Sequence, residues 1–170
     1  MKSVVMMGVA GCGKSSAGQA LASKLGLPLI EGDEFHPASN LDKMRQGLAL
    51  TDADRADWLS ALGLALAQQP SGAVLTCSAL KRSYRDRLRA QAPGLHFVFL
   101  EIDPGTAHQR VTARAGAHLF PPSLVDSQFA TLESPVGEAG VLRVDATQAL
   151  ASMTETVARW LSDEANKDKT

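Results

Sequence analysis

Short apolar runs alternate with helical patterns along the chain. Five runs, each bounded by glycine, proline or aspartate, predict strands at Val4–Met7, Leu29–Ile30 leading to Glu31, Ala73–Cys77, Leu95–Glu101 and Val141–Val144. Apolar residues at helical spacing predict helices at Lys14–Leu25, after Thr51 through Leu66, and at Lys81–Gln91, Pro104–Arg114, Pro122–Leu132 and Thr147–Leu161. Thr51 with Asp54 resembles a capping box that opens the second of these helices, and Leu80, Tyr84 and Leu88 are expected to form the buried stripe of the third. The runs are apolar without alternation, which is typical of strands covered on both faces.

This order of elements predicts the overall architecture. Strands that alternate with helices imply right-handed crossovers and an α/β fold, with a five-stranded parallel sheet covered by helices on both faces. The chain of 170 residues fits one domain spanning 1–170. Glycine and two prolines within residues 115–122 suggest a small lid, and the polar residues 163–170 suggest a frayed tail.

Composition and charge exclude several functional classes. Seventeen Lys and Arg against 18 Asp and Glu give a net charge of −1, so the whole surface offers no reason to expect nucleic acid or acidic membranes as partners. The run Val4–Ala10 is too short for a membrane span. Cys12 and Cys77 are far apart and suggest neither a disulfide framework nor a zinc site. A reducing cytoplasm is the simplest setting.

The strongest local signal is a phosphate-binding loop. Residues Gly8, Val9, Ala10, Gly11, Cys12, Gly13, Lys14 and Ser15 fit the P-loop pattern G-x-x-x-x-G-K-[ST], between a predicted strand and a predicted helix. Backbone N–H groups of this loop and of Ser16 at the helix start are expected to surround phosphate oxygens. Lys14 is expected to reach the β- and γ-phosphates of ATP, and the Ser15 hydroxyl to bind Mg²⁺.

Other residues must decide what happens to the nucleotide. The nearest string to a guanine-reading Asn-Lys-x-Asp, at 166–169, misses it, so a switch GTPase is disfavoured. The third strand ends in Cys77-Ser78 and therefore lacks the aspartate common at the end of a Walker B strand.

Asp33 and His36 follow the second strand, at the sheet edge where ligands of open α/β folds gather. Asp33 can accept the proton of a substrate hydroxyl, or it can serve only as a helix cap. His36 precedes a proline, and two interpretations stay open for it, a ligand contact or a residue of the turn.

Two groups of basic residues are further candidates. Lys81 and Arg82, next to a strand end, can bind a substrate anion, whereas Arg87 and Arg89 fit a solvated helix face. Arg110 and Arg114 are four residues apart, before the expected lid, and can neutralise charge on a transferring phosphoryl group.

The chain resembles the gluconate kinases of the phosphate-loop kinase superfamily over nearly its whole length. Beyond the loop at 8–15, the matching strings are Gly32-Asp33 with His36-Pro37 and Asn40, Lys43-Met44 with Gly47, Asp52-x-Asp54-Arg55 with Trp58-Leu59, Cys77-Ser78-Ala79-Leu80-Lys81-Arg82 with Tyr84-Arg85-Asp86 and Leu88-Arg89, and Ser127-Gln128-Phe129 with Leu132-Glu133 and Pro135.

This resemblance implies ATP-dependent phosphorylation of D-gluconate on its terminal hydroxyl, in a cytoplasmic homodimer with a sheet order like that of shikimate and nucleotide kinases. By position, Asp33 is the implied catalytic base and Arg110 and Arg114 the lid-side pair. The residues implied to line the sugar-acid pocket are His36, Lys43, Arg45, Lys81 and Gln128.

Two alternatives remain open from the sequence. The first is another small-molecule kinase of the same fold, such as a shikimate kinase, although that family carries a Gly-Gly-Gly turn where this chain has Cys77-Ser78-Ala79. The second is a nucleotide-binding regulatory or RNA-contacting module that uses the basic residues of Lys81–Arg89. Steep salt dependence of binding favours the module, and ATP turnover dependent on a sugar acid excludes it.

Overall fold

The structure is a computed structural model that describes residues 2–114 and 121–169. Its strands are β1 (Val4–Met7), β2 (Leu29–Glu31), β3 (Val74–Thr76), β4 (His96–Glu101) and β5 (Val141–Asp145). Its α-helices are α1 (Lys14–Leu25), α2 (Ala38–Arg45), α3 (Asp52–Ala67), α4 (Arg82–Gln91), α5 (Pro104–Ala113), α6 (Val125–Thr131) and α7 (Leu150–Lys167). Short 3-10 helices, η1 (Gly32–Phe35) and η2 (Pro122–Leu124), precede α2 and α6.

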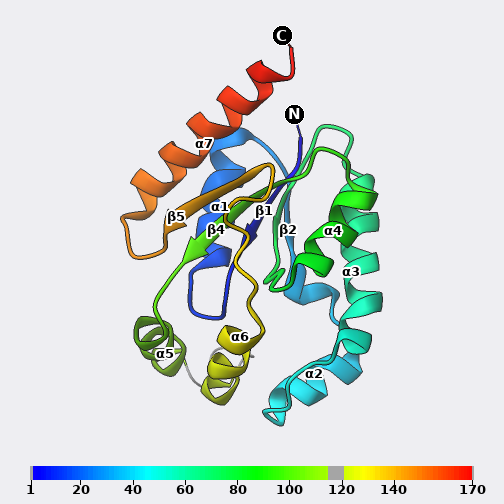
Figure 1. Ribbon diagram of the computed structural model, residues 1–170, viewed down its shortest axis with the longest axis vertical. Helices are drawn as coiled ribbons and strands as arrows, with labels where there is room; N and C mark the ends of the chain where they lie inside the picture. The colour runs from blue at the N-terminus through cyan, green and yellow to red at the C-terminus, as the bar shows by residue number, and fades with distance from the viewer. Residues whose placement is uncertain (1, 115–120, 170) are drawn as a thin grey trace.

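The five strands form one parallel sheet in the order β2-β3-β1-β4-β5, which confirms the predicted α/β architecture. The first residue of β1, Val4, pairs with Val74 on one side and His96 on the other, so β1 is the central strand. Helices α1 and α7 cover one face of the sheet, and α3 and α4 cover the other (Figure 1). Helices therefore cover both faces of the sheet, as the sequence predicted.

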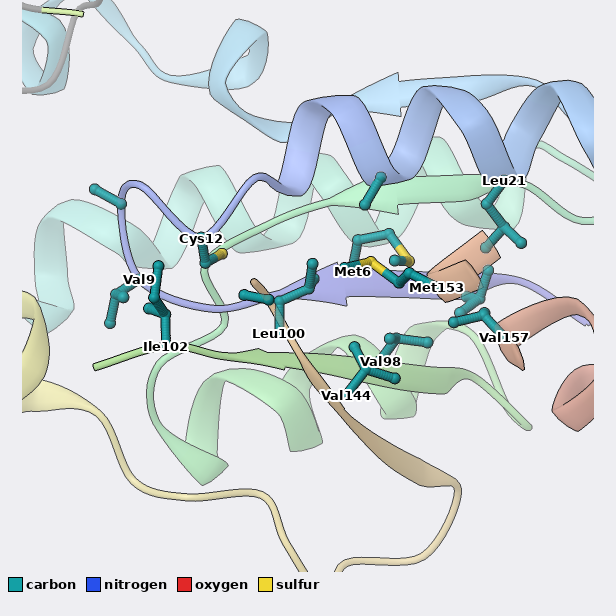
Figure 2. Close-up of a cluster of buried hydrophobic side chains, with 14 of the residues drawn as sticks. Met6, Val9, Cys12, Leu21, Val98, Leu100, Ile102, Val144, Met153 and Val157 are labelled. Carbon is teal, nitrogen blue, oxygen red and sulfur yellow. The ribbon is translucent and has the colours of Figure 1, made fainter. Parts of the chain in front are cut away.

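Alternate residues of the strands fill two separate cores. Val4 and Met6 of β1 face the core beneath α1 and α7, whereas Val5 and Met7 face the core beneath α3 and α4. Figure 2 shows the first core, in which Met6 lies near Met153 of α7 and Cys12 points in from the phosphate loop. All four residues of β1 are at most 1% exposed, which explains the apolar run without alternation.

Helix ends follow the sequence signals with a few differences. The Thr51 hydroxyl accepts the Asp54 N–H while the Asp54 carboxylate accepts the Thr51 N–H, so the predicted capping box opens α3. Gly26 ends α1 in the left-handed conformation, with φ of 65°. The helices η1 and α2 were not predicted, because they are short and bury few apolar residues.

The chain terminus differs from the expectation. Residues 163–170 were predicted to fray, but α7 continues to Lys167. The helix is anchored by the buried Leu161 and by an ion pair between Lys2 and Asp168, which joins the two ends of the chain. The lid predicted at 115–122 lies outside the described residues except for its last two positions, 121 and 122. Across residues 2–114 and 121–169, none of the helices has the length and apolar character needed to cross a bilayer.

Candidate active site

A cavity opens at the end of the sheet where the strands have their carboxyl ends. Its lining residues come from the segments that follow the strands and from helices that include α2 and α6, which lie at the lower end of the molecule in Figure 1. Segments that follow β1, β2 and β3 supply one wall, and α1, α2, α3, η2 and α6 supply the others, together with Arg114 after α5. The lining residues are Ala10, Gly11, Gly13, Lys14, Ser15, Asp33, His36, Met44, Ala49, Leu50, Arg55, Trp58, Ser78, Arg114, Leu124, Ser127 and Gln128. The phosphate loop and the predicted acceptor residues thus share one cavity.

The phosphate loop rests on the core and turns its backbone outward. The side chains of Val9 and Cys12 are buried, at 2% and 1% exposure, so they support the loop from below. Gly11 has φ of 84°, and a Cβ at this position would lie 2.8 Å from the Ala107 carbonyl oxygen. Only glycine fits this turn without strain. Ser16 is exposed and does not line the cavity.

In this structure the loop binds its own lysine. The Lys14 ammonium donates to the carbonyl oxygens of Gly8 and Val9, at 3.1 and 3.2 Å. The Gln128 side-chain oxygen accepts the N–H of Ala10 at 2.7 Å, which ties α6 to the loop. A phosphate entering the loop meets a cation and backbone donors at the start of α1, where the helix dipole also favours negative charge.

Ser15 lies beside a carboxylate that the sequence reading did not select. Its hydroxyl donates to Glu31 Oε2 at 3.1 Å, and the Thr76 hydroxyl donates to the same oxygen at 2.7 Å. Glu31 is the last residue of β2, and Thr76 is the last residue of the neighbouring β3. Hydroxyl and carboxylate oxygens are the donors that Mg²⁺ prefers. The parallel pairing of β2 with β3 explains this juxtaposition, which spacing alone does not reveal.

Asp33 lies in η1 with an exposed side chain that lines the cavity. Within the described residues its carboxylate has no hydrogen-bond partner, so a cap role for the side chain finds no support there. The preceding Gly32 comes so close to β3 that a Cβ would lie 2.1 Å from the Thr76 carbonyl oxygen. This close approach fixes where Asp33 leaves the sheet.

His36 lies flat against Trp58. The two rings are stacked with centroids 4.1 Å apart and an interplanar angle of 15°. Trp58 donates its indole N–H to the Gly32 carbonyl oxygen at 2.8 Å, which joins α3 to η1. Burial lowers the pKa of His36 to about 4, with nearby Asp33 opposing the shift and Arg55 adding to it. The imidazole is therefore neutral at neutral pH.

Arg55 is a second site residue that the sequence reading did not select. It lines the cavity although its side chain is 9% exposed, and its Nη1 donates to the Leu50 carbonyl oxygen and to the Tyr84 hydroxyl, at 3.0 and 3.1 Å. The sequence did not single out Arg55, because an arginine in the first turn of a helix with acidic neighbours is typical of a solvent-exposed position. A buried guanidinium open to a cavity is a strong binding group for a carboxylate.

The two lid-side arginines have different positions. Arg114 follows α5, is exposed and lines the cavity. Arg110 does not line it, and its guanidinium donates to the carbonyl oxygens of Gly11 and Ala146, each at 3.2 Å. Arg110 therefore braces the phosphate loop.

Four predicted substrate contacts do not reach the cavity lining. Each is paired with an aspartate: Lys43 with Asp54, Arg45 with Asp42, Lys81 with Asp52, and Arg82 with Asp86. The Lys43 hydrogen bonds are the main reason that the pKa of Asp54 falls to about 2. The family resemblance and the position next to a strand end suggested these cations, and in the folded chain each has a carboxylate partner.

The acidic partner of α4 was also missed. Arg85 and Arg89 share Glu138, with distances of 2.6 and 2.9 Å, and Arg85 is completely buried. Arg89 is three-quarters covered and lies over the Phe97 ring, so it does not belong to the solvated face that the sequence suggested. The apolar stripe Leu80, Tyr84 and Leu88 is buried as predicted.

Comparisons with known proteins agree with this geometry. The family model described as an AAA domain matches residues 4–135. The chain is 41% identical over 158 residues to the thermosensitive gluconokinase of Escherichia coli (strain K12), across 91% of this chain and 84% of that protein. A crystal structure of a gluconokinase from Sinorhizobium meliloti 1021 has a TM-score of 0.89 and 47% identity, covering 98% of this chain and 94% of that one.

A more distant structure shows the fold alone. The shikimate kinase of Aquifex aeolicus is 16% identical with a TM-score of 0.60, across 96% of this chain and 98% of that one. The predicted P-loop kinase fold is therefore confirmed, and the likeness to shikimate kinase extends to architecture only.

Proposed function

Since the chain belongs to the gluconokinase family of P-loop kinases, we propose that it phosphorylates D-gluconate on its terminal (C6) hydroxyl with ATP. The products are 6-phospho-D-gluconate and ADP. The observation that carries the proposal is the joining, in one cavity, of a phosphate loop with a carboxylate and a buried arginine. The arrangement holds a polyphosphate at one end and a hydroxylated anion at the other.

The phosphate end is formed by the loop amides at 8–15 and by Lys14. On binding, the nucleotide phosphates replace the carbonyl oxygens of Gly8 and Val9 as partners of the Lys14 ammonium. Ser15 and Glu31 are the residues that would hold Mg²⁺. When bound, the ion neutralises charge on the phosphates.

Asp33 acts as the base at the acceptor end. Its carboxylate takes the proton of the terminal hydroxyl as that oxygen forms a bond to the γ-phosphorus, while the bond from that phosphorus to the β–γ bridging oxygen breaks and ADP leaves. Arg114, at the cavity wall, neutralises charge on the transferring group, and Arg110 holds the loop beneath it. A cytoplasmic homodimer remains the expectation that the family resemblance carries.

The test of this function is ADP release from ATP and Mg²⁺ with D-gluconate, shikimate, glucose or buffer alone. We expect turnover with gluconate at a rate at least about 10²-fold above that with the others, because a site built around a polar group rejects substrates that leave that group unpaired. Comparable turnover with shikimate or glucose would overturn the substrate, and no turnover with any acceptor would favour a binding module.

Arg55 is the proposed partner of the gluconate carboxylate, in place of Lys81 or Arg82. We expect Arg55→Lys to lower kcat/KM for gluconate by about 10- to 100-fold, because it loses a charge-assisted hydrogen bond. The KM for ATP should change little. The kcat/KM for gluconamide, which lacks the negative charge, should fall much less in Arg55→Lys. The ratio of kcat/KM for gluconate to kcat/KM for gluconamide should therefore be smaller than in the wild type.

The control for Arg55 is Arg87→Lys. Arg87 lies exposed on α4, where it contacts the Ser60 hydroxyl, and its replacement should leave both KM values unchanged. An equal loss for gluconate and gluconamide in Arg55→Lys would contradict the assignment, since it would mean that Arg55 only supports α3.

A further inference from the structure

The side-chain amide of Asn40 fixes which nitrogen of His36 carries the proton. Asn40 Nδ2 lies 2.9 Å from the Asp54 carbonyl oxygen and 3.2 Å from His36 Nδ1. A carbonyl oxygen only accepts hydrogen bonds, so the contact with Asp54 identifies the Asn40 atom as the NH₂ donor. The second hydrogen of that group meets His36 Nδ1, which must accept it. The ring proton of a neutral His36 is therefore on Nε2.

The surroundings hold this arrangement in place. Asn40 is 2% exposed and belongs to α2, so its amide has little freedom to turn. Trp58 stacks on the face of the imidazole and is itself bonded to Gly32, so the ring plane is set as well. The charged groups facing His36 are Asp33 from η1 and Arg55 from α3, and burial keeps the imidazole neutral despite Asp33. His36 lines the cavity with Nδ1 already engaged.

We propose that Asn40 is a positioning residue that holds His36 as the Nε2–H tautomer, so that His36 offers the sugar acid a neutral hydrogen-bond donor. Nε2 is the one ring nitrogen left for a ligand, and in this tautomer it donates only. Its partner is therefore an acceptor oxygen, either a hydroxyl lone pair or a carboxylate oxygen. The identity of the ligand rests on the proposed function, whereas the tautomer does not.

The tautomer is measured without substrate. In ¹⁵N-labelled protein at neutral pH, the His36 signals are assigned by their loss in His36→Gln. We expect the wild-type spectrum to show a protonated Nε2 and a bare Nδ1. In Asn40→Asp, a carboxylate faces Nδ1 and the proton should move to Nδ1. A wild-type ring protonated on Nδ1, or an equal mixture of both tautomers, would overturn the proposal. This measurement is made on the wild-type protein, and the only variant that it needs in folded form is His36→Gln, which is used for assignment.

The donor role is measured by kinetics with two replacements of His36. His36→Phe keeps an aromatic ring against Trp58 but has no donor, whereas His36→Gln keeps a donor without the ring. We expect kcat/KM for gluconate to fall about 10- to 100-fold in His36→Phe and several-fold less in His36→Gln, with the KM for ATP unchanged in both. A His36→Phe enzyme as active as His36→Gln, or more so, would show that only the ring matters.

The pH profile separates positioning from simple support. In Asn40→Asp the proton of the neutral ring moves to Nδ1, so Nε2 has no hydrogen to donate, whereas the imidazolium form carries a proton on both nitrogens. The new carboxylate raises the pKa of His36, so the loss of kcat/KM in Asn40→Asp should be largest above that pKa and should shrink as the pH falls through it. Asn40→Ser removes the amide without adding charge and should lower kcat/KM by a factor that depends little on pH. A loss in Asn40→Asp that does not shrink on the acid side contradicts the proposal. Absence of gluconate turnover in the wild type would overturn the proposed function alone, since the tautomer measurement stands apart.

Discussion

Asp33→Asn is expected to lower kcat for gluconate phosphorylation by about 10²- to 10⁴-fold, the range that a positioned general base contributes. Asparagine fills the same space and still lines the cavity but cannot take the hydroxyl proton. Because Asp33 belongs to η1 and not to the phosphate loop, the KM for ATP should stay within a few-fold of the wild-type value. The measurement is ADP release at saturating ATP across a range of gluconate concentrations.

The neighbouring acid supplies the control for this change. Glu34 is exposed in the same 3-10 helix and does not line the cavity, so Glu34→Gln should retain nearly full kcat. If Asp33→Asn kept more than about a third of the wild-type kcat, proton transfer to Asp33 would not limit or assist the reaction, and the proposed base would be wrong.

Glu138→Ala is expected to destabilise the fold by about 3 to 5 kcal/mol, because removing one partner of a buried ion pair leaves the other charge uncompensated. Arg85 has no exposed side-chain surface, and its guanidinium also donates to the carbonyl oxygens of Ala79 and Glu133, at 2.7 and 3.0 Å. These bonds hold Ala79 at a φ of 47°, which a residue other than glycine rarely adopts. The free energy of unfolding in urea measures the effect.

An exposed ion pair is the matched control. Lys24 and Glu155 are both about half exposed, so Glu155→Ala should change the free energy of unfolding by less than about 1 kcal/mol. A loss below about 1 kcal/mol in Glu138→Ala would mean that the buried pair adds nothing beyond its cost of burial.

The effect of Glu138 also depends on pH. Burial raises the pKa of Glu138, but the hydrogen bonds from Arg85 and Arg89 outweigh it and hold the pKa below the ordinary value of 4.5. The difference in the free energy of unfolding between wild type and Glu138→Ala should therefore be constant above about pH 5. It should shrink as the pH falls below about 4.5, where Glu138 of the unfolded chain takes up a proton, until the pH passes the lower pKa of Glu138 in the folded protein.

The sequence predicted the sheet and its major helices because each of these elements has a clear apolar period. The strands predicted from Val4–Met7 and Leu29–Glu31 agree with the structure residue by residue. The capping box at Thr51 was also recognisable from the sequence. The helix α2 was missed because only Asn40 and Met44 of its eight residues are buried. A segment with so few apolar residues shows no helical periodicity in its sequence.

The candidate site was predicted in part, and the division has a physical cause. Lys14, Ser15, Asp33, His36 and Gln128 lie in or next to dense motifs, and the fold brings them to one cavity. Lys43 and Lys81 lie outside the cavity lining, and each is paired with an aspartate that only the folded chain brings near it. Arg55 and Glu31 were not selected from the sequence, because their surroundings also depend on how α3 and β3 lie beside other elements.

The central position of β1 has a consequence for how such a protein can change over time. The phosphate loop extends from a strand that is paired on both sides and buried on both faces, and it leads into α1, which packs on α7. The acceptor side instead extends from β2, a three-residue strand at the sheet edge, into short segments with little core of their own. Substitutions in these short segments leave the phosphate loop and its contacts intact. The acceptor specificity can therefore diverge while phosphate binding is inherited unchanged.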